Sequence, residues 1–208
     1  MSRLRWCCLL SLMFAAAVHA DDKSVDSKAA DVVTALHATL LDNMKRGAAL
    51  GCSGRVQHMA TAIDADFDLP FIGQRVLRRH WDEISADQRK QFMDAFRKLV
   101  LSTYASQFKR FGGESFTTLD AQAVASGESI VHARLTTGSG GTVSFDYVLH
   151  PVTGSDGSSW RVINVIADGV SDLALRSSQY DQIYKERGFD GLLAWIREQD
   201  KKTLADCS

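Results

Sequence analysis

The sequence has little proline, few cysteines and no marked excess of charge of either sign. Only 2 of its 208 residues are Pro and 4 are Cys, and 24 Lys and Arg stand against 25 Asp and Glu. A chain this close to neutrality lacks the basic field that attracts nucleic acid, and it has no polybasic cluster for anionic membranes. With 45% hydrophobic residues and no internal repeat or linker, it is predicted to form one globular domain that binds no nucleic acid.

Motifs for catalysis and for metal binding are also missing. The sequence contains no GxSxG, no HExxH and no dense cluster of His, Cys and Asp, so we expect no catalytic residue, metal or cofactor. The glycine-rich run at 138–141 precedes a predicted strand, whereas a phosphate cradle precedes a helix. Asp146, on a predicted strand, is a candidate general base, because cone-shaped α+β folds host small-molecule isomerases and hydratases. An outward-facing strand carboxylate is the simpler interpretation of this residue.

The N-terminus has the features of an export signal. Arg3 and Arg5 precede an apolar stretch, 6–18, that is too short to span a bilayer comfortably, and Val18-His19-Ala20 resembles a cleavage site. An uncleaved anchor or a buried first helix is the alternative. We predict a signal peptide over 1–20, one domain over 21–208 and localisation in the periplasm of a Gram-negative bacterium.

Removal of the signal peptide leaves two cysteines, Cys52 and Cys207. In an oxidising compartment two cysteines can pair, and a bond closing so long a loop contributes roughly 4–5 kcal/mol in the chain-entropy model. Two unrelated thiols are the alternative. A metal site is not expected, because cysteines this far apart lack ligand spacing.

Hydrophobic periodicity predicts helices at both ends of the chain and strands between them. Val33, Leu36 and Leu40 recur at helical spacing, whereas Val143, Phe145 and Tyr147 alternate with polar residues. Helices are expected near 26–46, 55–65, 70–79, 85–111, 172–187 and from 192, and strands near 115–126, 131–136, 143–149 and 160–167. This order indicates an α+β fold, with an antiparallel sheet of about four strands and helices on one face.

The helix predicted from 85 is the best defined. Ser85 and Gln88 form a capping box at its start, and apolar residues cover more of its circumference than a one-sided surface helix needs. This helix either packs on two sides or borders an apolar cavity. The strand at 160–167 is apolar on both faces, which is typical of a central strand.

Two separated motifs resemble a known family. The first is the run Phe67-Asp68-Leu69-Pro70-Phe71-Ile72-Gly73-Gln74-Arg75-Val76-Leu77, followed by His80-Trp81. The second is Trp160-Arg161-Val162-Ile163-Asn164-Val165-Ile166-Ala167-Asp168-Gly169-Val170-Ser171, followed by Arg176-Ser177. Together they resemble the MlaC / toluene-tolerance family of periplasmic phospholipid-binding proteins, over nearly the whole mature chain. The segment 162–175 looks more like the family's hopanoid-associated branch, HpnM.

The resemblance implies an α+β domain around an apolar pocket that takes the acyl tails of a lipid and leaves its headgroup in solvent. It also implies a shuttle between an outer-membrane lipoprotein complex and an inner-membrane ABC transporter complex, with either a phospholipid or a hopanoid as cargo. A ligand-free adaptor with a filled core is the remaining alternative. We predict that the pocket is lined by Phe92, Phe96, Leu99, Val100, Tyr104, Val131, Phe145, Tyr147, Val162 and Val165.

Overall fold

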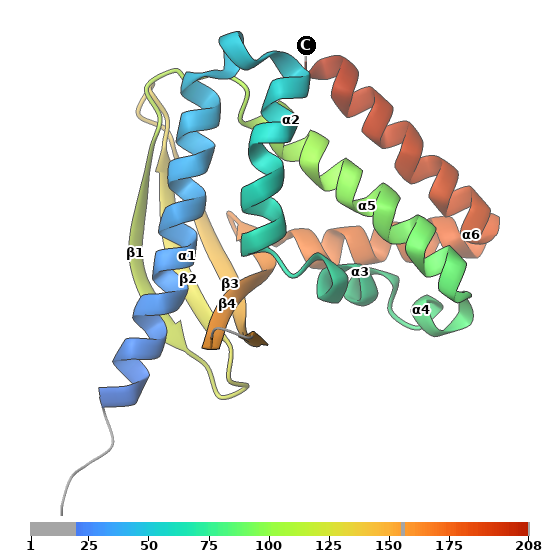
Figure 1. The fold of residues 1–208 in the computed structure, drawn as a ribbon, viewed down its shortest axis with the longest axis horizontal. Helices are drawn as coiled ribbons and strands as arrows, with labels where there is room; N and C mark the ends of the chain where they lie inside the picture. The colour runs from blue at the N-terminus through green and yellow to red at the C-terminus, as the bar shows by residue number, and fades with distance from the viewer. Residues whose placement is uncertain (1–19, 155–156, 208) are drawn as a thin grey trace, which may run out of the picture.

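The computed structural model describes residues 20–154 and 157–207, so the predicted signal peptide lies almost entirely outside the described residues. The described chain forms an α+β fold in which helices precede and follow an antiparallel sheet (Figure 1). The elements are α1 (Ala20–Lys45), α2 (Gly47–Asp66), α3 (Leu69–Leu77), α4 (His80–Glu83), α5 (Ala86–Gln107), β1 (Ser115–Ala123), β2 (Ser129–Thr136), β3 (Thr142–Gly154), β4 (Gly157–Ala167), β5 (Val170–Ser171) and α6 (Asp172–Asp206). The predicted fold class is confirmed.

The sheet is a meander in which every strand pairs antiparallel with its neighbour in the sequence. It has five strands rather than the expected four. The additional strand is β5, which follows a turn where Asp168 and Gly169 both have positive φ (46° and 79°). This turn reverses the chain so that Ser171 pairs with Ile166. Two residues are too few to show an alternating pattern, and β5 therefore has no signature in the sequence.

The helices are layered on the sheet and on one another. α1 packs against the sheet, α2 packs against α1 and α5, and α6 packs against α5 (Figure 1). Val33, Leu36 and Leu40 of α1 are fully buried, as their helical spacing predicts. Within the two described ranges, no helix combines the length and the apolar content that crossing a membrane requires.

Two glycines interrupt the long helices α2 and α6. Gly51 (φ 61°) lies inside α2 and Gly188 (φ 65°) lies inside α6, and in each case the helix resumes after a kink. Positive φ costs glycine little, so a single glycine in a non-helical conformation interrupts the helix and turns the chain. α6 therefore consists of two helical segments that meet at Gly188, as the sequence predicts.

The C-terminus is fixed to α2 by covalent and polar contacts. Cys52 and Cys207 form a disulfide bond, with Cα atoms 5.4 Å apart. Beside it lies Arg55, which is 5% exposed and donates hydrogen bonds to the carbonyl oxygens of Gly47 (2.6 Å), Ala105 (3.2 Å) and Cys207. The two cysteines are therefore paired in the structure and are not unrelated thiols.

Candidate functional site

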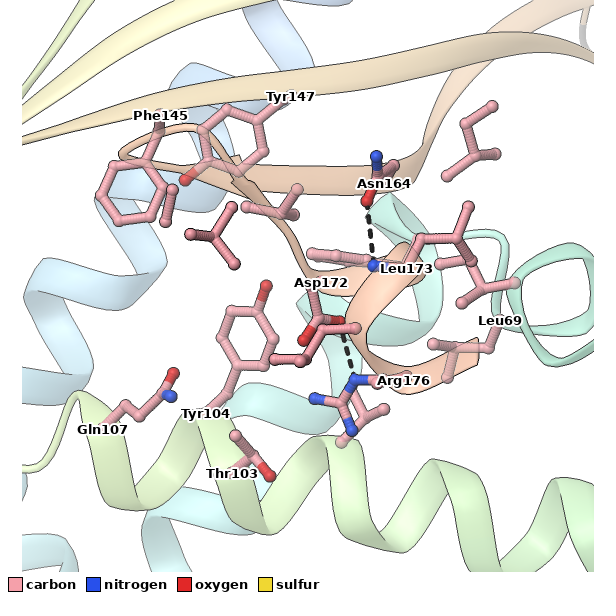
Figure 2. Close-up of a pocket in the computed structure, with 18 of the residues that line it drawn as sticks. Leu69, Thr103, Tyr104, Gln107, Phe145, Tyr147, Asn164, Asp172, Leu173 and Arg176 are labelled. Carbon is pink, nitrogen blue, oxygen red and sulfur yellow. Dashed lines mark hydrogen bonds and ion pairs between the residues drawn. The ribbon is translucent and has the colours of Figure 1, made fainter. Parts of the chain in front are cut away.

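A cavity of about 420 Å³ lies between the sheet and the helices. Its volume falls within the range of small-molecule sites, and most of its wall is aliphatic or aromatic. α5 forms one side and β3 and β4 form another, while α3 and the first turns of α6 close the remainder (Figure 2). The lining residues are Phe67, Leu69, Ile72, Phe96, Val100, Thr103, Tyr104, Gln107, Phe108, Phe145, Tyr147, Ile163, Asn164, Val165, Ala167, Val170, Asp172, Leu173, Leu175 and Arg176.

The structure brings six of the ten predicted lining residues together at this cavity. Phe96, Val100 and Tyr104 come from α5, Phe145 and Tyr147 come from β3, and Val165 comes from β4. On α5 these positions are spaced by four residues, which places them along one face of the helix. On the strands they are separated by two residues or paired across the ladder, as Tyr147 and Val165 are.

The other four predicted residues, Phe92, Leu99, Val131 and Val162, do not line the cavity. All four are in the hydrophobic core, and they are between 0% and 5% exposed. Phe92 packs edge-on against Tyr180 of α6, so the α5 surface at this point serves helix packing. Because α5 is covered by both α2 and α6, its broad apolar surface both packs on helices and borders the cavity.

Two exposed apolar side chains form a lip at the mouth of the cavity. Val170 is 59% exposed and Leu175 is 60% exposed, and both line the cavity. They are the most exposed large hydrophobic residues in the described part of the chain. Apolar surface that continues from a cavity to the outside of a protein marks a binding site more often than chance exposure does.

Hydrogen bonds fix the segment that carries this lip. The Ser171 hydroxyl accepts a hydrogen bond from the Ala174 backbone N–H (3.1 Å) and caps α6. The Asn164 side-chain oxygen accepts one from the Leu173 backbone N–H (3.2 Å). β4 and the first turn of α6 are thereby joined at the cavity mouth.

One ion pair lies on the otherwise uncharged wall of the cavity. Arg176 Nε donates to Asp172 Oδ2 at 2.7 Å (Figure 2). Burial by itself would lower the pKa of Arg176, but the Asp172 carboxylate raises it above the ordinary value, so the guanidinium remains charged. Sequence reasoning did not propose either residue, although both lie in or beside the second family-like motif.

Tyrosine hydroxyls supply further polarity without charge. Burial raises the pKa of Tyr104 and of Tyr147 above the ordinary tyrosine value. Behind the wall, the Tyr147 hydroxyl is hydrogen-bonded to His37 Nε2 (3.1 Å), and burial lowers the pKa of His37 to about 4. At neutral pH these three groups are therefore uncharged, which suits a cavity for apolar matter.

Asp146, the candidate general base, is not at the cavity. Its Oδ1 lies 2.6 Å from Nδ1 of His132, the residue opposite it on β2. The neighbouring residues Phe145 and Tyr147 line the cavity, and side chains alternate along a strand, so Asp146 faces the other side of the sheet. Residues 20–154 and 157–207 contain no group of three or more His, Cys, Asp or Glu side chains that could hold a metal ion.

Comparison with known proteins connects this cavity with a family. A family model described as MlaC protein matches residues 34–198 of the chain. The chain belongs to the MlaC family. The match covers α2 to β5 completely, the second half of α1 from residue 34 and most of α6, so it includes every element that contributes to the cavity. The resemblance seen in the two sequence motifs is confirmed.

One solved structure shares the fold. It is the phospholipid-binding protein from Ralstonia solanacearum, determined in complex with a phospholipid. The two proteins superpose with a TM-score of 0.69 at 21% sequence identity, over 85% of this chain and 98% of the other. The α+β architecture is therefore common to both chains.

Proposed function

We propose that this protein is a lipid shuttle that carries one phospholipid at a time through the periplasm. The observation that supports it is the apolar cavity with its exposed lip, Val170 and Leu175. An acyl tail gains about 0.8 kcal/mol for each methylene that leaves water, so an apolar cavity that opens to solvent is suited to extracting tails. A binding protein needs no reacting group at this site, and we propose no catalytic activity.

The proposed cargo is a phospholipid. Support comes from the relative of the same fold, which was determined with a phospholipid bound, and from the family itself. A hopanoid is the second candidate, because the segment 162–175 resembles the hopanoid-associated branch. Both ligands would place an apolar body inside the cavity and a polar end at its mouth.

The route of transport follows from the family resemblance. We propose that residues 1–20 direct export and are removed after Ala20, leaving 21–208 as a single lipid-binding domain. The carrier would then exchange lipid with an inner-membrane ABC transporter complex and an outer-membrane lipoprotein complex. Lipid would enter and leave past the lip at the cavity mouth. A partner that covers this exposed apolar surface would let the tails move from one protein to the other without crossing water.

Native mass spectrometry tests this proposal directly. The full chain is expressed in a Gram-negative host, and the protein is recovered from the periplasm without detergent. The expected result is a chain that starts at residue 21 and carries a mass increment of one lipid, which solvent extraction then identifies as phospholipid or hopanoid. A ligand-free mass, from a protein that also fails to take up lipid from vesicles, would contradict the carrier function and favour the ligand-free adaptor.

A further inference from the structure

The charges on the cavity wall are balanced and close together. Asp172 and Arg176 are the two charged residues among those that line the cavity in the described chain, and they stand one turn apart on α6. Their ion pair joins Arg176 Nε to Asp172 Oδ2 at 2.7 Å. The other polar side chains on the wall, among them Tyr104, Gln107 and Asn164, are uncharged, so a charged ligand group finds its charged partners only in this ion pair.

The two charges lie at different depths. The side chain of Arg176 is 17% exposed, whereas that of Asp172 is 51% exposed. The guanidinium is therefore the inner group and the carboxylate is the outer one. A guanidinium has five N–H groups, and the hydrogen bond from Nε of Arg176 to Asp172 uses one of them. The remaining donors are available to an acceptor at the cavity mouth.

We propose that this ion pair recognises the headgroup of the cargo and selects a zwitterionic phospholipid. Arg176 binds the phosphate of this headgroup, and Asp172 binds its ammonium group. The inference rests on the proposed function, because it assumes that the tails occupy the cavity. With the tails inside, the phosphate lies nearer to the cavity than the ammonium, and this order matches the inner arginine and the outer aspartate. Guanidinium groups bind phosphate oxygens in fork geometry, which suits Arg176 to the inner position.

Asp172 also acts against the wrong headgroup. A zwitterionic headgroup adds a phosphate beside the guanidinium and an ammonium beside the carboxylate, so each charge gains an opposite neighbour. An anionic headgroup without an ammonium would pair with Arg176 but leave the Asp172 carboxylate facing a phosphate of like charge. The carboxylate is half exposed and is therefore partly screened by solvent, so the discrimination is modest.

The test is a competition between headgroups. Delipidated protein, prepared from the periplasm after expression of the full chain, is incubated with vesicles of equal phosphatidylethanolamine and phosphatidylglycerol with the same tails. Lipid extracted from the protein gives both the total load and the ratio of the two headgroups. Asp172→Asn removes the outer charge, Arg176→Gln removes the inner charge, and Asp87→Asn is the matched control, since Asp87 is an exposed acid in the first turn of α5.

The wild-type protein is expected to take up phosphatidylethanolamine preferentially. Asp172→Asn should lower that preference about two- to fivefold, as expected for a half-exposed charge pair. Arg176→Gln should weaken the binding of both lipids about tenfold, and Asp87→Asn should change neither quantity. Equal uptake of the two lipids by the wild-type protein, or a preference unaffected by Asp172→Asn, overturns the headgroup inference and leaves the carrier function standing. No uptake of either lipid by the wild-type protein contradicts both.

Discussion

Filling the cavity should displace the tails of the cargo. Val165 lies on β4 in the cavity wall and pairs with Tyr147, so a larger side chain at this position projects into the space that a tail would occupy. Val165→Trp keeps a residue with high strand propensity and leaves the ion pair of Asp172 and Arg176 unchanged. The variant therefore perturbs volume rather than charge.

The size of the effect follows from the volume that is lost. If the indole excludes about four methylenes, the tail forfeits about 3 kcal/mol of transfer free energy, at about 0.8 kcal/mol for each. That difference corresponds to about 200-fold weaker binding. Retention of a fluorescent-tailed phospholipid, titrated from vesicles, measures it.

The control is the adjacent residue on the same strand. Ile166→Trp makes the same kind of change, but alternation along β4 directs Ile166 to the opposite face of the sheet, and it does not line the cavity. It should bind lipid as the wild-type protein does. If Val165→Trp folds with a Tm close to that of Ile166→Trp and still retains lipid like the wild-type protein, the tails do not occupy this cavity.

Three further predictions concern stability and the cavity mouth. Since burial lowers the pKa of His37 from 6.5 to about 4, the unfolded chain binds more protons at this residue between these pH values, and the contribution of His37 to stability should fall by about 3 kcal/mol as the pH drops from 6.5 to 4. Urea unfolding of the wild-type protein and of His37→Gln across pH 7 to 4 measures this contribution as the difference between their pH dependences. Reduction of the Cys52–Cys207 bond, which closes a separation of 155 residues, should lower the free energy of unfolding by about 3 to 5 kcal/mol, and an unchanged denaturation midpoint after dithiothreitol would contradict this. Leu175→Asp on the exposed lip should slow lipid uptake from vesicles severalfold while changing the unfolding free energy by less than about 0.5 kcal/mol, and undiminished uptake would show that the lip is not used.

Features that depend on neighbouring residues in the chain were predictable from the sequence. The capping box of Ser85 and Gln88 is present as expected. Helical spacing identified the buried face of α1, and strand alternation placed Phe145 and Tyr147 on one face of β3. These signals are local, because a cap spans three residues and a periodic pattern needs only one element.

Tertiary packing decided which apolar residues became cavity wall and which became core. Phe92 and Phe96 are one turn apart on α5, yet only Phe96 lines the cavity, because α6 covers Phe92. A helix that is covered on two sides is apolar over a broad surface, so its hydrophobic pattern does not distinguish core residues from cavity-lining residues.

By itself, then, the sequence determined the fold class, the family and most element positions, through short-range periodicity, caps and two motifs. Only the tertiary structure placed Asp172 and Arg176 at the cavity mouth, exposed Val170 and Leu175 beside them, and brought Cys207 to Cys52. The physical reason is that these features depend on how separate elements pack against one another. Packing sets the burial of each side chain and the distance between residues far apart in the chain, and no local pattern encodes either of them.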